Sequence, residues 1–484
     1  MSNFKNKEIM RTIKYLVMGV VLAGFSTTAM AQDGTKADVD AVKNIINSKP
    51  ADLDKQMKPY LGKNKKNAEN LVAFARAFYE AKDTANARVY ANHALKAAKN
   101  NYAPAYILLG DIAALAEDGG GAAAQYEMAI HFDPKNAEAY RKYASVYRKI
   151  SPAGAVAKLE ELRQQVPDYP VDALIGHINY ISNRFGEAIE AYDKVPQSKL
   201  EKMDIIESAF SAYLTQKYEK GIEMAKLGLQ KEPRNSTLNR LAMFCNTELK
   251  NFPDALQYAD KLFNQSDSAN ISYMDYVYYG NALKGDKQQD KAIEMFKKAL
   301  EQEFDNKDKR AGVVKTLSDA YSDMDLYDEA ILYYEQYLKE YSTPTATDHA
   351  GLPQLHYYKS QKLQGDDRIA ALKKADELYQ QLQTNYPDAE EYATFWRARV
   401  NNAMDNDQEG GLAKPFYESL ISQIEPKAEK SKSDTARLKE GYLYLISYLA
   451  RVKNDMNAAK EVATKLAEID PENEVAKQVL SIGK

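Results

Sequence analysis

The five histidines are the residues best suited to metal binding or proton transfer, because the imidazole ring serves both tasks near neutral pH. They are His93, His131, His177, His349 and His356. No two of them have the spacing that places a pair of zinc ligands on one face of a helix. Pro353 also interrupts the interval between His349 and His356. We therefore expect no catalytic zinc.

One acidic segment, Asp405–Gly410, begins like a calcium-binding loop. Its sequence, DNDQEG, has acidic side chains at alternate positions and a glycine at the sixth. The twelfth position of such a loop supplies a bidentate carboxylate, but Phe416 stands there. We therefore expect an exposed loop rather than a calcium site, and no bound metal.

Catalytic and nucleotide-binding motifs are missing from the sequence. It contains no GxxxxGK[ST] phosphate loop, no GxGxxG after a strand and no GxSxG nucleophile motif. The single cysteine, Cys245, excludes an internal disulfide and is best interpreted as a small core residue. We predict that the chain is not an enzyme and uses no cofactor. An enzyme within the irregular segment 343–435 is the alternative.

Residues 10–31 have the pattern of a secretory signal peptide. Arg11 and Lys14 precede an apolar run from Tyr15 to Phe25, and small residues follow it. Ala29 and Ala31 form an A-x-A pattern, so we expect cleavage after Ala31, with Met10 as an alternative start. A membrane anchor is the competing interpretation, but the apolar run is about half of a bilayer-spanning length.

This leader predicts an exported protein that is periplasmic or associated with the outer membrane. Cys245 lies far from the expected cleavage site, so no lipid-modified cysteine follows it and we expect a non-lipidated protein. No other stretch is long and apolar enough to span a bilayer, so we expect no transmembrane segment in the mature chain. The net charge of −4 argues against a nucleic-acid partner.

The helical elements that must position any site recur along the chain. Residues 103–136, 273–304 and 311–342 share one order of aromatic, small and aliphatic residues. Steps of three and four residues place these side chains on one face of a helix. Each unit predicts two short helices forming a hairpin, with Gly110 and Ala122 where the two helices cross closely. A proline commonly ends the unit, because proline cannot continue a helix.

This pattern resembles the tetratricopeptide repeat, a 34-residue helical hairpin with small and large core residues in the same order. Tyrosine or an aliphatic residue replaces the tryptophan that is common in the family, and the unit at 169 has Leu200 where a proline is usual. The resemblance implies an all-α fold, an α-solenoid of about 10–11 stacked hairpins forming a curved right-handed superhelix. The frames begin near residues 68, 103, 137, 169, 202, 236, 273, 311, 356, 389 and 440.

The repeat frames divide the chain into five segments. We expect the signal peptide at 1–31, capping helices around Pro50 at 32–67 and a regular array at 68–342. Divergent hairpins with insertions follow at 343–435, where 343–365 is read as an insertion. A C-terminal repeat and capping helix occupy 436–484.

In the family that the chain resembles, partner peptides lie along the concave side, which the first helix of each hairpin lines. The corresponding residues are Arg141, Arg148, His177, Tyr180, Phe210, Tyr213, Arg240, Phe244, Asn281, Lys284 and Lys315. Four aromatic residues form the middle of this set and basic residues flank them, which would suit an acidic or aromatic peptide. The alternative is that these side chains pack on one another and bind nothing.

These observations predict a non-enzymatic interaction scaffold or adaptor of the bacterial cell envelope. Its expected partners are other envelope proteins or peptides, with peripheral outer-membrane association as an option. A glycan-binding or sugar-uptake accessory protein is the second hypothesis, since some proteins of that kind are also built on these repeats.

Overall fold

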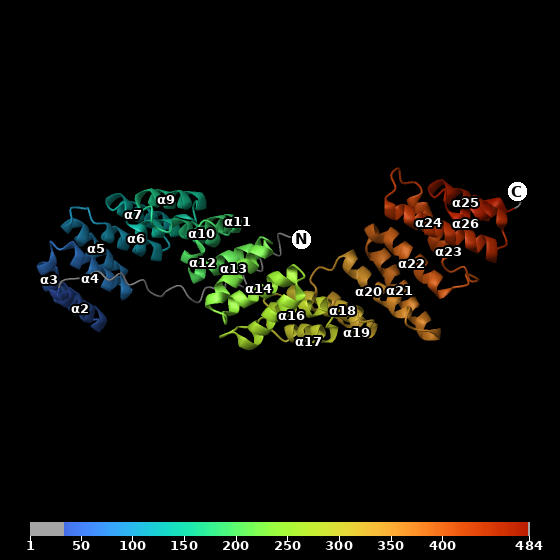
Figure 1. Ribbon diagram of the computed structural model, residues 1–484, viewed down its shortest axis with the longest axis horizontal. Coiled ribbons are helices and arrows are strands. Elements are labelled where there is room, and N and C mark those ends of the chain that lie inside the picture. Colours follow the sequence, from blue (N-terminus) through green and yellow to red (C-terminus); the bar gives the residue numbers. More distant parts are fainter. Residues whose placement is uncertain (1–32, 483–484) are drawn as a thin grey trace. The chain divides into compact units, whose positions relative to one another are not determined.

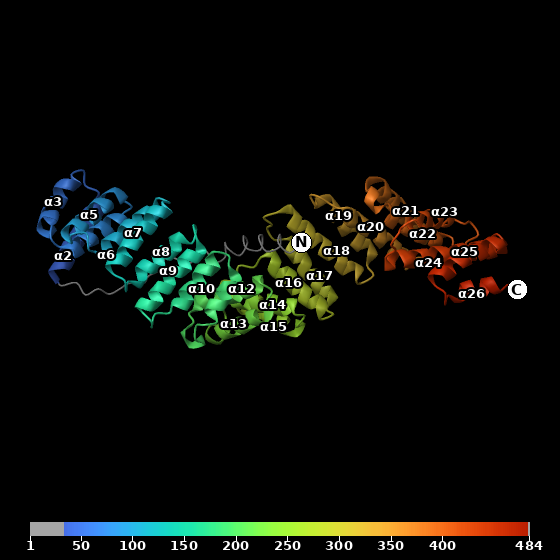
Figure 2. The same cartoon turned by 90° about the horizontal axis from the view of Figure 1, so that it is seen from above.

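The computed structural model describes residues 33–482, and these residues form α-helices joined by short turns, without a β-strand among them (Figures 1 and 2). The expected signal peptide at 1–31 lies outside the described residues. The chain divides into two compact units. Unit 1 contains the residues up to Leu249 together with 260–269, and unit 2 contains 250–259 and the residues from 270 onward.

Unit 1 is a succession of antiparallel helices, each packed against its neighbours in the chain. Its α-helices are α2 (Asp33–Ser48), α3 (Leu53–Asn64), α4 (Ala68–Glu80), α5 (Thr84–Ala97), α6 (Ala103–Leu115), α7 (Gly119–Phe132), α8 (Ala137–Tyr147), α9 (Pro152–Gln165), α10 (Val171–Ile181), α11 (Phe185–Tyr192), α12 (Lys202–Leu214), α13 (Tyr218–Lys231) and α14 (Ser236–Glu248). The helices α2 and α3 lie on either side of Pro50, as predicted.

Unit 2 continues the same construction with longer turns. Its α-helices are α15 (Phe252–Asp260), α16 (Tyr273–Gly285), α17 (Gln289–Leu300), α18 (Lys307–Ser322), α19 (Tyr327–Glu340), α20 (Ala346–Ser360), α21 (Gly365–Asn385), α22 (Glu390–Met404), α23 (Lys414–Ile424), α24 (Lys432–Ser447), α25 (Met456–Ile469) and α26 (Glu474–Ser481). Between residues 33 and 482, none of the helices combines the length and the apolar character that a bilayer crossing requires.

Glycines let the two helices of a hairpin approach closely. A Cβ added to Gly176 would lie 2.7 Å from the ring of Tyr192, and one added to Gly280 would lie 2.5 Å from the ring of Phe296. Real side chains essentially never approach so closely, so in these two hairpins the ring on the second helix occupies space that a side chain on the first helix would need. Gly110 stands under Tyr126 in the same way, as predicted. The predicted all-α fold of stacked hairpins is confirmed.

A recurrent asparagine explains where hairpins begin. Asn136, Asn235 and Asn473 each cap a first helix, because the side-chain oxygen accepts a hydrogen bond from a backbone N–H of the first turn. The side-chain nitrogen of each donates to the carboxylate three residues earlier, at 2.9–3.2 Å. The acid–proline–charged–asparagine segment therefore forms the same turn at three places, and its asparagine caps the helix that follows.

The helix α20 corrects the predicted repeat frame. We expected an insertion at 343–365 and a repeat beginning near residue 356, but α20 runs without a break from Ala346 to Ser360. A capping box starts it, in which Thr345 and Asp348 exchange hydrogen bonds. Pro353 lies inside this helix and is buried. Pro353 does not end the helix, because its burial in the apolar interior offsets the lost backbone hydrogen bond.

Two smaller predictions are confirmed by burial. Cys245 is fully buried, and burial, followed by the charges of Glu248 and Glu219, raises the pKa of its thiol to about 12, as expected of a core residue. The segment Asp405–Gly410 is a largely exposed turn between α22 and α23. There the Asp405 carboxylate accepts backbone hydrogen bonds from Gly410 and Leu412 at 3.1 Å.

His356 on α20 gives the fold a specific pH dependence. Burial, then the charges of Lys359 and Lys374, lowers the pKa of His356 to about 4, from 6.5 in the unfolded chain. Between these values the unfolded chain binds more protons than the folded chain. Stability should therefore fall as the pH drops below 6.5 and level off near pH 4. The difference between the two pKa values corresponds to about 3 kcal/mol, and because the half-buried ring is partly screened by solvent, we expect a loss of about 2 kcal/mol.

The single tryptophan, Trp396, reports on this region, because its ring contacts Tyr357, the residue after His356, at a centroid distance of 5.5 Å. Urea denaturation followed by Trp396 fluorescence at pH 7 and pH 4.5 measures the effect. In His356→Gln the pH dependence should shrink by about 2 kcal/mol. Equal pH dependence in the two proteins would show that His356 does not titrate in this range.

Candidate functional site

The predicted groove residues are divided between the two units. Those from Arg141 to Phe244 belong to unit 1, and Asn281, Lys284 and Lys315 belong to unit 2. In unit 1, four of them are buried. Phe210 is 6 % exposed, Tyr213 and Arg240 are each 5 % exposed, and Phe244 is 1 % exposed.

The aromatic residues of unit 1 pack on one another in a row that runs along α10, α12 and α14. The ring centroids are separated by 6.2 Å for Tyr180–Phe210, 6.5 Å for Phe210–Tyr213 and 5.6 Å for Tyr213–Phe244. The first helices α10, α12 and α14 contact one another directly, which closes the space around these rings. Phe210, Tyr213 and Phe244 therefore have little surface left for a partner.

The remaining predicted residues have mixed surroundings. Arg141 is exposed, whereas Arg148 donates to the Ile181 carbonyl at 3.1 Å, and burial lowers the pKa of its guanidinium. Asn281 is half-buried. Lys284 forms an ion pair with Asp323 at 2.6 Å. Their role in partner binding stays a prediction.

His177 belongs to a polar cluster with a buried carboxylate. The Glu207 side chain is 4 % exposed, accepts a hydrogen bond from the Tyr192 hydroxyl at 2.5 Å and lies 3.0 Å from Nδ1 of His177. Burial, then the Glu207 charge, raises the pKa of Tyr192 far above its ordinary value. Glu207 of α12 thus lies between the His177 ring of α10 and the Tyr192 hydroxyl of α11.

A similar cluster occurs two hairpins earlier in the chain. There the acidic residue and the residue that can be positively charged have exchanged repeat positions. Asp111 accepts hydrogen bonds from the Tyr126 hydroxyl at 2.8 Å and from Lys142 at 2.6 Å. Asp111 and His177 occupy one repeat position, and Lys142 and Glu207 occupy another. Both clusters join consecutive hairpins, so their first role is structural.

Removing the Tyr192 hydroxyl should destabilise unit 1. Tyr192→Phe leaves the buried Glu207 carboxylate with one hydrogen-bond partner fewer, and such a bond to a charged group contributes about 2 kcal/mol. Tyr140→Phe is the matched control, because Tyr140 is 2 % exposed and its hydroxyl has no hydrogen bond to a described side chain among the causes that raise its pKa. Urea denaturation followed by circular dichroism measures both variants. Equal losses would show that the hydrogen bond from the Tyr192 hydroxyl to Glu207 adds nothing to the stability of unit 1.

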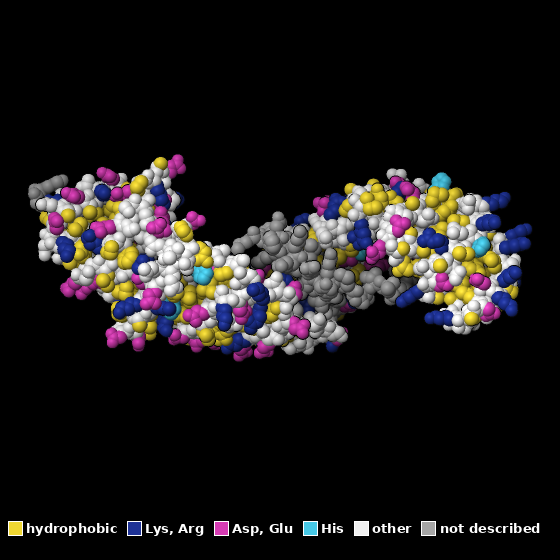
Figure 3. Space-filling view, turned by 180° about the vertical axis from the view of Figure 1, so that it is seen from behind, with side chains coloured by type: hydrophobic (Ala, Val, Ile, Leu, Met, Phe, Trp, Pro, Cys, Tyr) yellow, Lys and Arg dark blue, Asp and Glu magenta, His cyan; other side chains and the backbone are white. Residues whose placement is uncertain are grey.

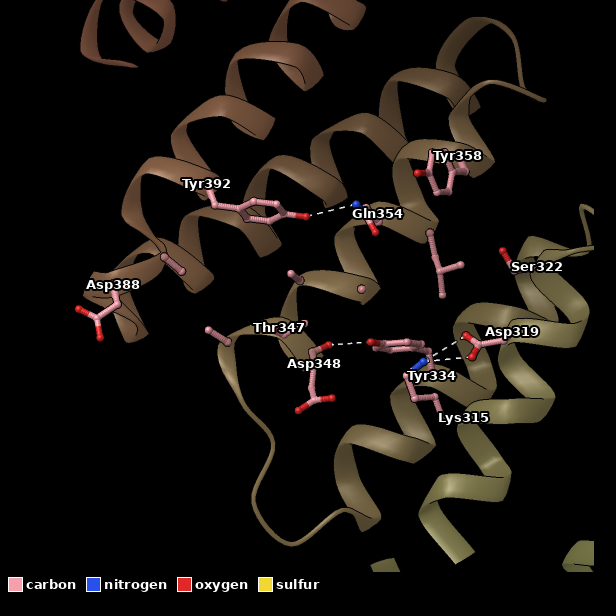
Figure 4. Close-up of a pocket in the computed structure, with 15 residues that line it drawn as sticks. Lys315, Asp319, Ser322, Tyr334, Thr347, Asp348, Gln354, Tyr358, Asp388 and Tyr392 are labelled. Atoms are coloured by element: carbon pink, nitrogen blue, oxygen red, sulfur yellow. Dashed lines mark hydrogen bonds and ion pairs between the residues drawn. The ribbon is translucent and has the colours of Figure 1, made fainter. Parts of the chain in front are cut away.

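A cleft of about 600 Å³ lies within unit 2 (Figure 4). Its walls come from the first helices of three consecutive hairpins, α18, α20 and α22, with Tyr334 of α19 at its base. The resemblance to the repeat family predicts partner binding along these first helices. Of the predicted groove residues, Lys315 lines the cleft.

The α18 wall carries an ion pair. Lys315 and Asp319 lie one helical turn apart with 3.0 Å between their charged atoms, and Ser322 follows on the same face. The Lys315 ammonium also lies 5.8 Å from the centroid of the Tyr334 ring, a favourable cation–π distance. In Figure 4 these groups gather on one side of the cleft.

The start of α20 forms the floor. The Tyr334 hydroxyl donates to the backbone carbonyl of Asp348 at 2.8 Å, and Gly351 leaves the space that the hydroxyl occupies. Burial raises the pKa of the Asp348 carboxyl, but hydrogen bonds from Tyr337 and Thr345 lower it by more, so the pKa lies below its usual value. Asp348 is therefore ionised at neutral pH.

The side of the cleft toward α22 presents a tyrosine and an amide, since Gln354 of α20 donates to the Tyr392 hydroxyl at 3.2 Å (Figure 4). Tyr358, also on α20, is 37 % exposed and lies on the side of Ser322 (Figure 4). Asp388, at the start of the α22 wall, is also exposed. The cleft thus offers exposed aromatic surface and a side-chain amide. Its charged groups are three carboxylates and one ammonium.

This composition is suited to binding rather than to metal chemistry. Within the described residues no group of three or more histidine, cysteine, aspartate or glutamate side chains is arranged to hold a metal ion. Asp348, Gln354 and Tyr358 were not predicted because the start of α20 was taken for an insertion, and Tyr392 was not predicted because the groove positions were assigned only as far as the repeat at 311–342. The threonine and aspartate of the capping box, three residues apart at 345 and 348, were the available signal.

Comparison with known proteins identifies one repeat directly. Residues 316–343 match the family model of the tetratricopeptide repeat. No curated protein sequence matches the chain.

Among solved structures, the C-terminal part of a TPR repeat-containing protein from Cytophaga hutchinsonii is similar, with 22% identity and a TM-score of 0.48, over 57% of this chain and 100% of that one. A tetratricopeptide repeat protein from Parabacteroides merdae is 18% identical with a TM-score of 0.34, over 51% of this chain and 96% of that one. The matched residues 316–343 include the last part of α18 and all of α19, so the match to the tetratricopeptide repeat falls on the hairpin that forms one wall of the cleft.

Proposed function

We propose that the chain is a non-enzymatic interaction scaffold that holds an extended segment of a partner protein in the cleft of unit 2. The observation that carries this proposal is the cleft itself, which runs across three consecutive first helices and keeps the Tyr358 ring partly exposed. An extended peptide needs such a continuous channel, with aromatic surface for side chains and amides or hydroxyls for its backbone.

The charges of the cleft favour a basic or aromatic peptide. Lys315 is already paired with Asp319. The Asp348 carboxylate accepts hydrogen bonds from Tyr337 and Thr345, and the Lys315 charge also acts on it. Asp388 is exposed and makes no ion pair with a described residue, so a lysine or arginine of the partner would complement this carboxylate. This differs from the prediction of an acidic or aromatic peptide, which rested on the basic residues flanking the predicted aromatic groove.

A displayed library of random peptides tests the proposal. Peptides selected on the protein should be enriched in arginine, lysine and aromatic residues, and Tyr358→Ser with Asp388→Asn should weaken their binding at least tenfold. Both positions are exposed, so the fold should persist. The matched control is Leu332→Ser with Glu335→Gln, which also removes one exposed apolar side chain and one acid, on α19 outside the cleft. Equal binding by the two variants would exclude the cleft as the docking site.

The proposal includes a place for the scaffold, in the envelope of a bacterial cell as a periplasmic or outer-membrane-associated, non-lipidated protein. The support is the pattern of a basic start, an apolar run and an A-x-A site before Gln32. Amino-terminal sequencing of the protein from a fractionated cell should give Gln32 as the first residue. A chain that retains residues 10–31 and stays in the cytoplasm would contradict export.

A further inference from the structure

A second depression, of about 740 Å³, lies in unit 1 between α3 and the end of α5. Five lysines line it together with His93, and we call it the lysine pocket. The lysines are Lys58, Lys65, Lys66, Lys96 and Lys99. Leu61 and Ala97 supply apolar surface between them. Figure 3 shows dark blue side chains gathered over these N-terminal helices.

The positive charge of the lysine pocket is not balanced locally. No carboxylate lines it, and none of its five lysines makes an ion pair with a described residue. Lys63, which lies between them in sequence, behaves differently, because it pairs with Asp38 at 2.8 Å. All five pocket lysines are exposed, so their charges are available to a ligand.

Stabilisation of helix ends explains only part of this cluster. α3 ends at Asn64 and α5 ends at Ala97, and a cation near a helix C-terminus contributes about 0.3–1 kcal/mol. Lys65 and Lys96 are placed for that role. Lys58 and Lys66 add like charges to the same depression, where mutual repulsion opposes folding. A multiply charged anion would remove that repulsion.

We propose that the lysine pocket docks the protein onto a membrane surface that carries anionic phosphate headgroups. Lysine ammonium groups are point charges on flexible stems and lack the planar fork with which arginine fixes one phosphate. No arginine and no helix N-terminus lines the lysine pocket, so the attraction is spread over several anions rather than focused on one. Leu61 and Ala97 offer apolar contact below the headgroups. This inference does not depend on peptide binding in unit 2.

Vesicle co-sedimentation of the purified chain tests the inference. Vesicles of equal parts phosphatidylglycerol and phosphatidylcholine should retain the protein at 50 mM salt more than vesicles of phosphatidylcholine alone, and 300 mM salt should weaken this excess. The patch variant replaces Lys58, Lys65, Lys66 and Lys96 with glutamine. Its binding to the anionic vesicles should fall by about a hundredfold or more, since each of the four lysines near such a surface contributes roughly fivefold.

The control variant replaces four exposed lysines elsewhere, Lys226, Lys231, Lys298 and Lys373, with glutamine, which gives the same change in net charge. It should bind as the unaltered chain does. Equal loss in both variants, or none in the patch variant at unchanged helicity, would overturn the inference. Binding of free tripolyphosphate in the lysine pocket without binding to anionic vesicles would also overturn it, because the source would then be a soluble anion.

Discussion

Phe244→Asn should destabilise unit 1 by about 4 kcal/mol or more, because it removes a buried ring and places an amide in apolar surroundings. Phe244 on α14 is 1 % exposed, and its ring lies against that of Tyr213. A residue that merely lined a groove would tolerate the change, since surface substitutions usually alter stability by less than about 0.5 kcal/mol. Urea denaturation followed by circular dichroism distinguishes the two cases.

Leu115→Asn is the matched control for Phe244→Asn. Leu115 ends α6 in the same unit and is 57 % exposed, so this change should cost less than about 0.5 kcal/mol. If both variants unfold at the same urea concentration, Phe244 is a surface residue, and the aromatic row of unit 1 becomes available to partners again.

The second large effect is expected where a glycine lies under a ring. Gly280→Val should destabilise unit 2 by about 3 kcal/mol, because the new side chain overlaps the Phe296 ring and forces α16 and α17 apart. A Cβ at this position would already lie 2.5 Å from a ring carbon. The hairpins on either side lose contact area at the same time, since the stability of a stacked array depends on adjacent units.

Gly312→Ala on α18 is the control, and it should raise the free energy of unfolding where Gly280→Val lowers it. A Cβ at Gly312 would meet no atom within 4 Å, and the residue is exposed. Gly312→Ala should therefore stabilise the helix by about 0.5–1 kcal/mol, the usual gain for alanine in a helix interior. Trp396 fluorescence during urea denaturation reports both variants. Stabilisation by Gly280→Val would contradict the close crossing of α16 and α17.

The fold was predictable because its determinants are local. Gly110 with Tyr126, and Gly280 with Phe296, recur at a fixed interval, so sequence spacing alone identifies a small residue facing a large one. The predicted repeat frame was wrong at α20, because Pro353 was taken as a helix end although the helix continues through it. Helix starts would have been placed better by reading Asn136 and its counterparts as caps rather than by reading the preceding prolines as stops.

The candidate site was only partly predictable, because exposure depends on how neighbouring hairpins stack. The repeat positions of Phe210 and Tyr213 are the same as those of Asp319 and Ser322. In unit 1 the helices α10, α12 and α14 contact one another and bury the two aromatic residues. In unit 2 a cleft lies among α18, α20 and α22, and Asp319 and Ser322 line it. The position of a residue in the repeat predicts which face of its helix it occupies. It does not predict how far that helix lies from the first helix of the next hairpin.

Photo-crosslinking from inside the cleft tests the central claim most directly. A photoreactive phenylalanine analogue at position 358 replaces an exposed tyrosine of the cleft, and the same analogue at position 332 replaces an exposed leucine of α19 outside it. In living cells, position 358 should yield a discrete crosslinked product that position 332 does not give. The same product from both positions, or from position 332 alone, would show that partners do not dock in this cleft.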